Sequence, residues 1–176
     1  MYKILKKEKL NKDVDLMVIE APLIARNTKP GNFLIVRTNQ DSERIPLTIV
    51  ESDEKSVTII YQKIGYSTME LGKKDVNEHL QDVVGPLGKA KEIEHREKII
   101  GVAGGVGAAP LYPQLKAYAE NGSQVDLVIG AKNRFALTFE DPKAFDHTNL
   151  AEQKYLERSF EIATQLNFVF KSISNQ

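Results

Sequence analysis

The stretch "IIGVAGGVGAAPLYPQLKAYAENG", residues 99–122, predicts a buried strand, a glycine-rich turn and a helix in direct succession. Its first residues form a short apolar run without alternation, which is typical of a parallel strand covered on both faces. Pro110 suits the first helical position, and Pro113 is still close to the first turn. Apolar residues then recur at three- and four-residue steps along one helix face: Leu111, Leu115, Tyr118 and Ala119.

A second apolar strand, "QVDLVIGA" at 124–131, follows an Asn-Gly pair suited to end the helix. Strand, helix and strand fill the roughly 30 residues of a βαβ unit. Counted from Gly105, the loop reads GxGxxP, which lets backbone N–H groups approach a diphosphate. We expect residues 104–110 to bind a nucleotide; the alternative is a tight structural turn.

The residues that follow the second strand bear on which nucleotide is bound. The usual dinucleotide fingerprint ends in glycine and has an acidic residue after that strand for the ribose hydroxyls. This loop ends in Pro110, and the strand runs into Ala131, Lys132 and Arg134. Basic residues suit a 2′-phosphate better than a free 2′-hydroxyl. The alternative is that they belong to a solvated loop.

Composition excludes several classes of function. The 176 residues hold 24 basic and 24 acidic side chains, a balance that predicts no nucleic-acid or membrane partner. The absence of cysteine removes disulfides, thiolate zinc sites and cysteine-ligated clusters, and the three histidines lie far apart, so we expect no metal site. No apolar run reaches the ~20 residues of a membrane span, and the start lacks a signal-peptide core. We therefore expect a cytoplasmic protein.

The first half of the chain is rich in strand-forming residues. Runs of branched and aromatic residues, separated by turn signals, occupy 15–22, 33–39, 45–52 and 56–64. Their spacing predicts an antiparallel barrel or sandwich, followed by a short helix near 67–76 capped by Ser67 or Thr68. We expect a β-barrel domain at 1–95 and a shortened α/β domain at 96–176.

Two motifs in the barrel half contain residues that burial alone does not explain. "ERIPLTIVESD" offers the Arg44 guanidinium for a pair of phosphate oxygens, and Thr48 offers a hydroxyl to a ring nitrogen. Pro46 lacks an N–H, so its strand should lie at an edge or a bulge. Downstream, Gly65 and the Ser67-Thr68 pair form a helix start suited to an anion. Taken singly, each feature is more often structural, as a surface arginine or a helix cap; their order is what points to a site.

The order of these motifs resembles the ferredoxin–NADP⁺ reductase superfamily, in which a flavin-binding β-barrel precedes a nicotinamide-binding α/β domain. "KPGNFLIVR", "ERIPLTI", "VVGPLGKA" and "GVAGGVGAAPLYPQLKAY" are similar to one branch of it. That branch contains the alpha subunit of NADH-dependent ferredoxin:NADP⁺ oxidoreductase and the electron-transfer subunit of dihydroorotate dehydrogenase B. The resemblance covers about residues 1–141.

The resemblance implies a site for FAD and a site for NAD(P)H. The flavin would be lined by Arg44, Pro46, Leu47 and Thr48, and its diphosphate would meet Gly65, Ser67 and Thr68. The nicotinamide nucleotide's diphosphate would lie against Gly104, Gly105, Val106, Gly107 and Pro110, and its adenosine end against Ala131 and Lys132.

The implied activity is that of an FAD-dependent NAD(P)H oxidoreductase subunit, with NADPH preferred over NADH. It would move a hydride between coenzyme and flavin, with no side chain acting as acid or base. Its electrons would go to a larger catalytic oxidoreductase subunit or an electron acceptor protein.

The chain departs from the family pattern in its last part. The family's cysteine-rich segment is missing, so we expect no iron–sulfur cluster, and residues 142–176 form an unfamiliar tail with helical spacing at Leu156, Phe160 and Ala163. The alternative hypothesis is therefore a non-enzymatic, shortened paralogue that binds flavin or a partner.

Overall fold

The chain divides into two compact units, with the boundary between Glu92 and Ile93. The computed structural model describes residues 1–130, the last three of them by their backbone alone. Each unit is described by itself below. The expected helix in 151–166 lies outside the described residues.

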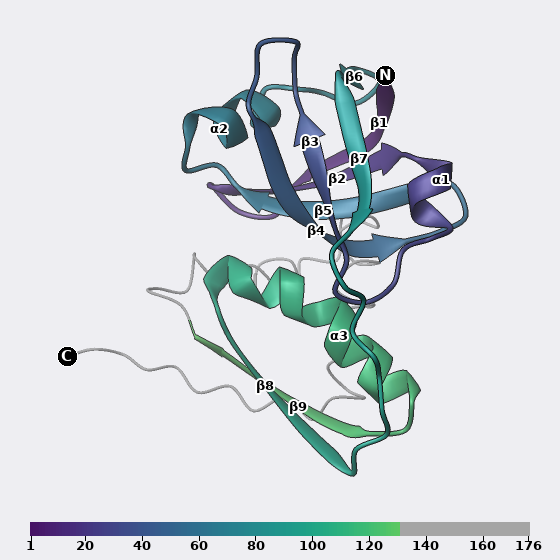
Figure 1. The fold of residues 1–176 in the computed structure, drawn as a ribbon. Coiled ribbons are helices and arrows are strands. Elements are labelled where there is room, and N and C mark those ends of the chain that lie inside the picture. The colour runs from purple at the N-terminus through teal and green to yellow at the C-terminus, as the bar shows by residue number, and fades with distance from the viewer. Residues whose placement is uncertain (131–176) are drawn as a thin grey trace, which may run out of the picture. The chain divides into compact units, whose positions relative to one another are not determined.

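The first unit is a nearly closed antiparallel barrel, as the sequence predicted (Figure 1). Its seven strands follow the order β6-β1-β2-β5-β4-β3-β7. The strands are β1 (Tyr2–Lys9), β2 (Val14–Glu20), β3 (Phe33–Arg37), β4 (Arg44–Ser52), β5 (Ser56–Gln62), β6 (His79–Leu80) and β7 (Asp82–Leu87). Two short helices, α1 (Pro22–Ala25) and α2 (Tyr66–Gly72), complete the unit. The four predicted strands are confirmed as β2 to β5.

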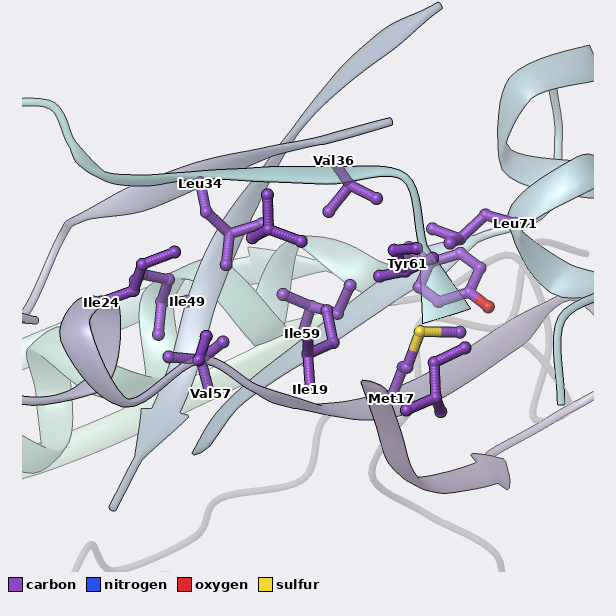
Figure 2. Packing of buried hydrophobic residues seen from close by; sticks show 14 of the residues in the cluster. Met17, Ile19, Ile24, Leu34, Val36, Ile49, Val57, Ile59, Tyr61 and Leu71 are labelled. Carbon is purple, nitrogen blue, oxygen red and sulfur yellow. The ribbon is translucent and has the colours of Figure 1, made fainter. Parts of the chain in front are cut away.

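The barrel encloses one hydrophobic core. Branched side chains from β2, β3, β4 and β5 fill it, and Leu71 of α2 joins them from outside the sheet. Figure 2 shows the Tyr61 ring close to Met17 and Leu71. All three are at most 2% exposed, so α2 is held to the barrel by a buried apolar contact.

Helix α2 begins earlier than the sequence predicted. Its N-cap is Gly65, so the expected cap at Ser67 or Thr68 was wrong, and both residues lie in the first turn. Thr68 instead reaches back: its hydroxyl oxygen accepts hydrogen bonds from the N–H groups of Gly65 at 3.1 Å and Ile64 at 3.3 Å. A side chain three residues into the helix thus satisfies amides at its start.

Strand β4 lies between β3 and β5 in the sheet, but its first half, which contains Pro46, pairs only with β3. Pro46 pairs with Ile35 of β3, whereas pairing with β5 starts only at Ile49. The missing N–H of Pro46 therefore interrupts no ladder on the β5 side. The expected edge or bulge position is correct for this half, and the register also shifts between Ile49 and Glu51.

The second unit contains the predicted βαβ arrangement. Strand β8 (Lys98–Gly104) leads through a short 3₁₀ turn, η1 (Gly105–Gly107), into α3 (Ala108–Glu120) and the parallel strand β9 (Gln124–Gly130). The predicted apolar face of α3 packs on the sheet, with Leu115 only 3% exposed. As expected, the helix ends at a left-handed glycine, Gly122, with φ +83°.

Strand β8 differs from the sequence expectation on one face. Ile100 and Val102 are 61% and 74% exposed, so the side away from α3 is not covered. An unalternating apolar run predicts a strand buried on both sides, and this prediction was wrong for the face of β8 that points away from α3.

Candidate functional site

The "RIPLT" motif divides between the two faces of β4, because successive side chains in a strand point to opposite sides. Arg44, Pro46 and Thr48 share the outer face of the barrel, with Arg44 and Pro46 exposed. Ile45 and Leu47 pack against the core. The structure therefore groups three of the four implied flavin residues and places Leu47 behind them, on the opposite face.

The neighbouring strands extend this outer face. Arg44 lies opposite Arg37 of β3, which in turn lies opposite Asp82 of β7; Pro46, Ile35 and Val84 form the next row. We call this surface the outer platform; it consists of Arg44, Pro46 and Thr48 of β4, Phe33, Ile35 and Arg37 of β3, and Asp82 and Val84 of β7.

The outer platform is charged at one end and apolar at the other. At the charged end, Arg44 Nη2 lies 3.9 Å from Asp82 Oδ2, and Arg37 Nη1 donates a hydrogen bond to the Gln40 carbonyl at 3.3 Å. This end thus holds one ion pair and a second guanidinium that is bonded to a backbone carbonyl. At the apolar end, Val84 is 43% exposed, and Ile35 lies between it and Pro46. Such a surface fits a ligand with a flat ring system and an anionic group.

A hydrogen bond brings the second motif to the charged end. The Ser67 hydroxyl donates to Glu43 Oε2 at 2.8 Å, and Glu43 immediately precedes Arg44. The segment 65–68 and Arg44 are therefore neighbours, although more than 20 residues separate them in the chain. Because both hydroxyls of the Ser67-Thr68 pair bond to the protein, the groups of this turn left for an anion are its backbone N–H groups.

Sequence reasoning missed Asn32, which fixes the end of the outer platform. Its side chain is almost fully buried, and Nδ2 donates to the carbonyls of Leu87 and Gly88, both at 3.1 Å. Oδ1 accepts from the Lys29 N–H at 2.8 Å. Asn32 thus ties the loop before β3 to the end of β7. A polar residue directly after Pro-Gly and before an apolar strand was the available signal.

The glycine loop of the second unit has the backbone that a close ligand approach needs. Gly105 has φ +50°, a conformation that other residues rarely adopt. A Cβ added at Gly107 would meet no atom within 4 Å, so the space beside it is open. No side chain of the described residues caps either η1 or α3. The Ala108 N–H donates to backbone carbonyls of η1, and Ala108 and Ala109 are buried, so the open space at this loop lies beside Gly107.

Two expectations about this loop need adjustment. Pro110 is the third residue of α3, counted from Ala108, whereas we expected it at the first position; the third still lies in the turn whose N–H groups have no helical acceptor. Gly101, which we had not singled out, lets α3 approach β8, because an added Cβ would lie 2.7 Å from Leu115 Cδ1. Ala131 and Lys132 lie outside the described residues.

The described part of the chain gives no support for two other kinds of site. Residues 1–130 contain no group of three or more metal-ligating side chains. Within the same residues, no helix has the length and apolar character of a membrane span.

Comparisons with known proteins show which proteins this chain resembles. The chain is 42% identical over 150 residues to an uncharacterised protein encoded in the adh 3′ region of Clostridium beijerinckii, covering 80% of this chain and 51% of that protein. It is 37% identical over 143 residues to a dihydroorotate dehydrogenase B (NAD⁺) electron transfer subunit homologue of Thermotoga maritima, with the same coverage. No protein-family model matches.

A solved structure matches nearly the whole chain. The NADH-dependent reduced ferredoxin–NADP oxidoreductase, described in a study of flavin-based electron bifurcation, superposes with a TM-score of 0.82 at 29% identity. The match covers 99% of this chain and 58% of that one. The chain thus has a ferredoxin reductase-like fold and spans about half the length of the curated relatives it matches.

Proposed function

We propose that this chain, a member of the ferredoxin–NADP⁺ reductase superfamily, is a flavin-binding electron-transfer subunit that moves a hydride between NAD(P)H and FAD. The observation that supports this most is the Ser67–Glu43 hydrogen bond. It joins two motifs, far apart in sequence, at the charged end of the outer platform.

The residues of the outer platform fit FAD in both chemistry and position. Arg44 would pair with a phosphate oxygen, and the backbone N–H groups of residues 66–68 would donate to the same diphosphate. Pro46 and Thr48 would lie along the flavin ring, with the Thr48 hydroxyl near a ring heteroatom. Leu47 would act from behind, by fixing β4 on the core. When bound, FAD supplies the redox chemistry, and the protein supplies orientation and electrostatics.

The glycine loop is proposed to hold the nicotinamide nucleotide. Gly105 and Gly107 leave room for a diphosphate beside the start of α3. Gly104, Val106 and Pro110 would frame it from the strand and helix sides. Ala131 and Lys132 would meet the adenosine end, and the positive charge of Lys132 would favour the 2′-phosphate of NADPH.

A larger catalytic subunit or acceptor protein is proposed to take the electrons. The Thermotoga maritima relative is named as an electron transfer subunit homologue, which implies such a partner for that protein. We extend this role to the present chain. No side chain is assigned as acid or base, because hydride transfer to a flavin needs none.

The visible absorption spectrum of the purified chain tests this proposal. We expect a yellow protein that bleaches when NADPH is added without oxygen. A yellow protein that stays yellow would instead support the alternative, a flavin-binding module without oxidoreductase activity. A colourless protein that FAD does not reconstitute would refute both. An Arg44→Ala variant, measured in parallel, shows whether the colour depends on the outer platform.

A further inference from the structure

A buried carboxylate lies near the segment that precedes α2. The side chain of Asp15 on β2 is 3% exposed and lies opposite Tyr61 of β5. Two lysines neutralise it: Lys63 Nζ donates to Oδ1, and Lys7 Nζ lies 4.0 Å from Oδ2. Burial, followed by the charge of Asp15, raises the pKa of the Tyr61 hydroxyl far above its usual range. The group is thus a compact, charged network in which the carboxylate is buried and the two lysines are partly buried.

Lys7 also holds the end of α2. Its Nζ donates to the carbonyls of Gly72 at 2.5 Å and Lys74 at 2.7 Å. The last carbonyls of a helix have no partner within the helix, and a cation there is favoured. The Lys7 side chain is 16% exposed, so these bonds are partly shielded from water. Lys7 therefore fastens β1 to the end of α2.

Lys63 fastens the other end of the same segment. At Gly72 an added Cβ would lie 2.6 Å from Lys63 Cδ and 3.6 Å from Asp15 Oδ2, so the lysine stem runs along the glycine. Lys63 N–H also donates to the Asp13 carbonyl at 2.7 Å. Both ends of the segment 63–74 are thus linked to the Asp15 carboxylate, the first end through Lys63 and the second through Lys7. The segment forms a loop with a closed base, and residues 65–68 lie away from that base.

We propose that Lys7, Asp15 and Lys63 form a clamp that positions residues 65–68 for the diphosphate of the cofactor. This proposal rests on the proposed function. None of the three residues is a catalytic residue; they act through the loop as positioning residues. Three charged groups are costly to bury, and an ionic network of this kind defines one geometry where apolar contacts would allow several.

The test uses the full chain and a Lys7→Met variant, which keeps most of the stem and removes the charge. Lys9→Met is the matched control, because Lys9 lies on the same strand and is exposed. The first measurement is amide hydrogen exchange in the free protein. We expect faster exchange at the N–H groups of Gly65 and Met69, which are bonded to Thr68 Oγ1 and the Gly65 carbonyl, in Lys7→Met. Exchange at Ile19 and Ile59 in the barrel core should be unchanged. Lys9→Met should match the parent.

The second measurement is the affinity for FAD, titrated by flavin fluorescence. Lys7→Met should weaken binding at least about tenfold, which corresponds to about 1.4 kcal/mol. Lys7→Arg should restore most of the loss, because a guanidinium can also donate to two carbonyls. Combined with Thr68→Ala, which loosens the turn directly, Lys7→Met should cost less than it does alone. Such coupling is expected of residues that act through the same segment.

Three results would overturn the clamp. One is parental exchange at Gly65 and Met69 in Lys7→Met. Another is faster exchange that extends equally to Ile19 and Ile59, which would mean a general loss of stability. The third is an FAD affinity equal to the parent's. If the parent itself does not bind FAD, the proposed function fails, and so does the cofactor role of the clamp. The exchange data then still decide whether Lys7 orders the loop.

Discussion

Arg44 of β4 and Asp82 of β7 form an ion pair across β3, with 3.9 Å between Nη2 and Oδ2. In the free protein, Asp82 is thus the partner of the guanidinium that we assign to a phosphate. Arg44→Ala should remove a charge-assisted hydrogen bond to the cofactor, typically worth roughly 1.5–3 kcal/mol. FAD affinity should fall at least about tenfold. Titration of the apoprotein with FAD measures it; equal affinities would remove Arg44 from the site.

Asp82→Asn provides the matched variant for that prediction. The pair is exposed, and such pairs contribute under about 1 kcal/mol. Releasing Arg44 from Asp82 should leave FAD affinity unchanged or raise it. A loss as large as that of Arg44→Ala would show that the ion pair, rather than the free guanidinium, is what binding needs.

Gly107→Ala should separate nucleotide binding from folding. Gly107 has φ −62° and an added Cβ meets nothing within 4 Å, so the free protein should tolerate alanine. A bound diphosphate would collide with that methyl group, and we expect NAD(P)H to bind roughly tenfold more weakly, a change of about 1.4 kcal/mol. Flavin reduction rates and FAD content check it; unchanged rates would contradict a nucleotide at this loop.

Gly105→Val is a less clean test of the same loop. It should slow flavin reduction and leave FAD content near normal. Because Gly105 has φ +50°, valine also strains the backbone there. Loss of flavin together with activity would therefore report unfolding, and Gly107→Ala is the variant that decides.

Gly122→Ala should lower the free energy of unfolding of the second unit. Gly122 has φ +83°, and its N–H donates to the Ala119 carbonyl while Ser123 N–H donates to Tyr118, both at 3.0 Å. Alanine in this left-handed conformation costs about 1–2 kcal/mol. Denaturant unfolding measures the change, with Gly107→Ala as the control at the other end of α3. A loss below about 0.5 kcal/mol would contradict the cap.

Tyr61 should make the first unit less stable at high pH. Its pKa is raised in the folded state, by burial first and by Asp15 second, whereas an unfolded tyrosine ionises near pH 10. Above that pH the unfolded state binds fewer protons, so the free energy of unfolding falls, by up to about 1.4 kcal/mol per pH unit. Tyr61→Phe should lack this term.

The comparison of Tyr61→Phe with the parent at neutral and alkaline pH measures it. At pH 7 the variant should be equally or more stable, because the hydroxyl has no hydrogen-bond partner among the described residues. Parallel stability curves above about pH 10 would show that Tyr61 is accessible to base.

Lys132→Ala should abolish the preference for NADPH. An exposed charge contributes under about 1 kcal/mol, so the preference should be about fivefold and shrink as salt is raised. Stopped-flow flavin reduction with NADPH and NADH at two salt concentrations measures both effects. A preference for NADH, or one that survives the substitution, would refute the role of Lys132.

The local motifs were predictable because their physical signals are local. Alternation in "RIPLT" already separates Arg44, Pro46 and Thr48 from Ile45 and Leu47, and it could have placed Leu47 behind the site. By contrast, β1 was missed because its strand, Tyr2–Lys9, is rich in lysine and reads as a solvated segment. Only the pairing with β2 explains it.

Contacts between distant residues were beyond sequence reasoning. No sequence pattern indicates that Ser67 forms a hydrogen bond with Glu43, or that Asp15 forms ion pairs with Lys7 and Lys63. A polar residue inside an apolar strand was visible at position 15, but its partners depend on how the barrel closes. Ile100 and Val102 are exposed although the sequence predicted their burial. An apolar run indicates that burial is favourable, but it does not identify the element that covers the strand.

The strands at the two ends of the barrel's strand order, β6 and β7, are separated in the chain by Gln81 alone, whose N–H donates to the Arg37 carbonyl at 3.0 Å. A single residue therefore connects the two strands that lie at opposite ends of the strand order. β6 has two residues, and β7 contains Pro86, so neither offers a long template for a foreign strand. A partner that adds a strand at either end of this strand order would therefore find only a short or proline-interrupted edge.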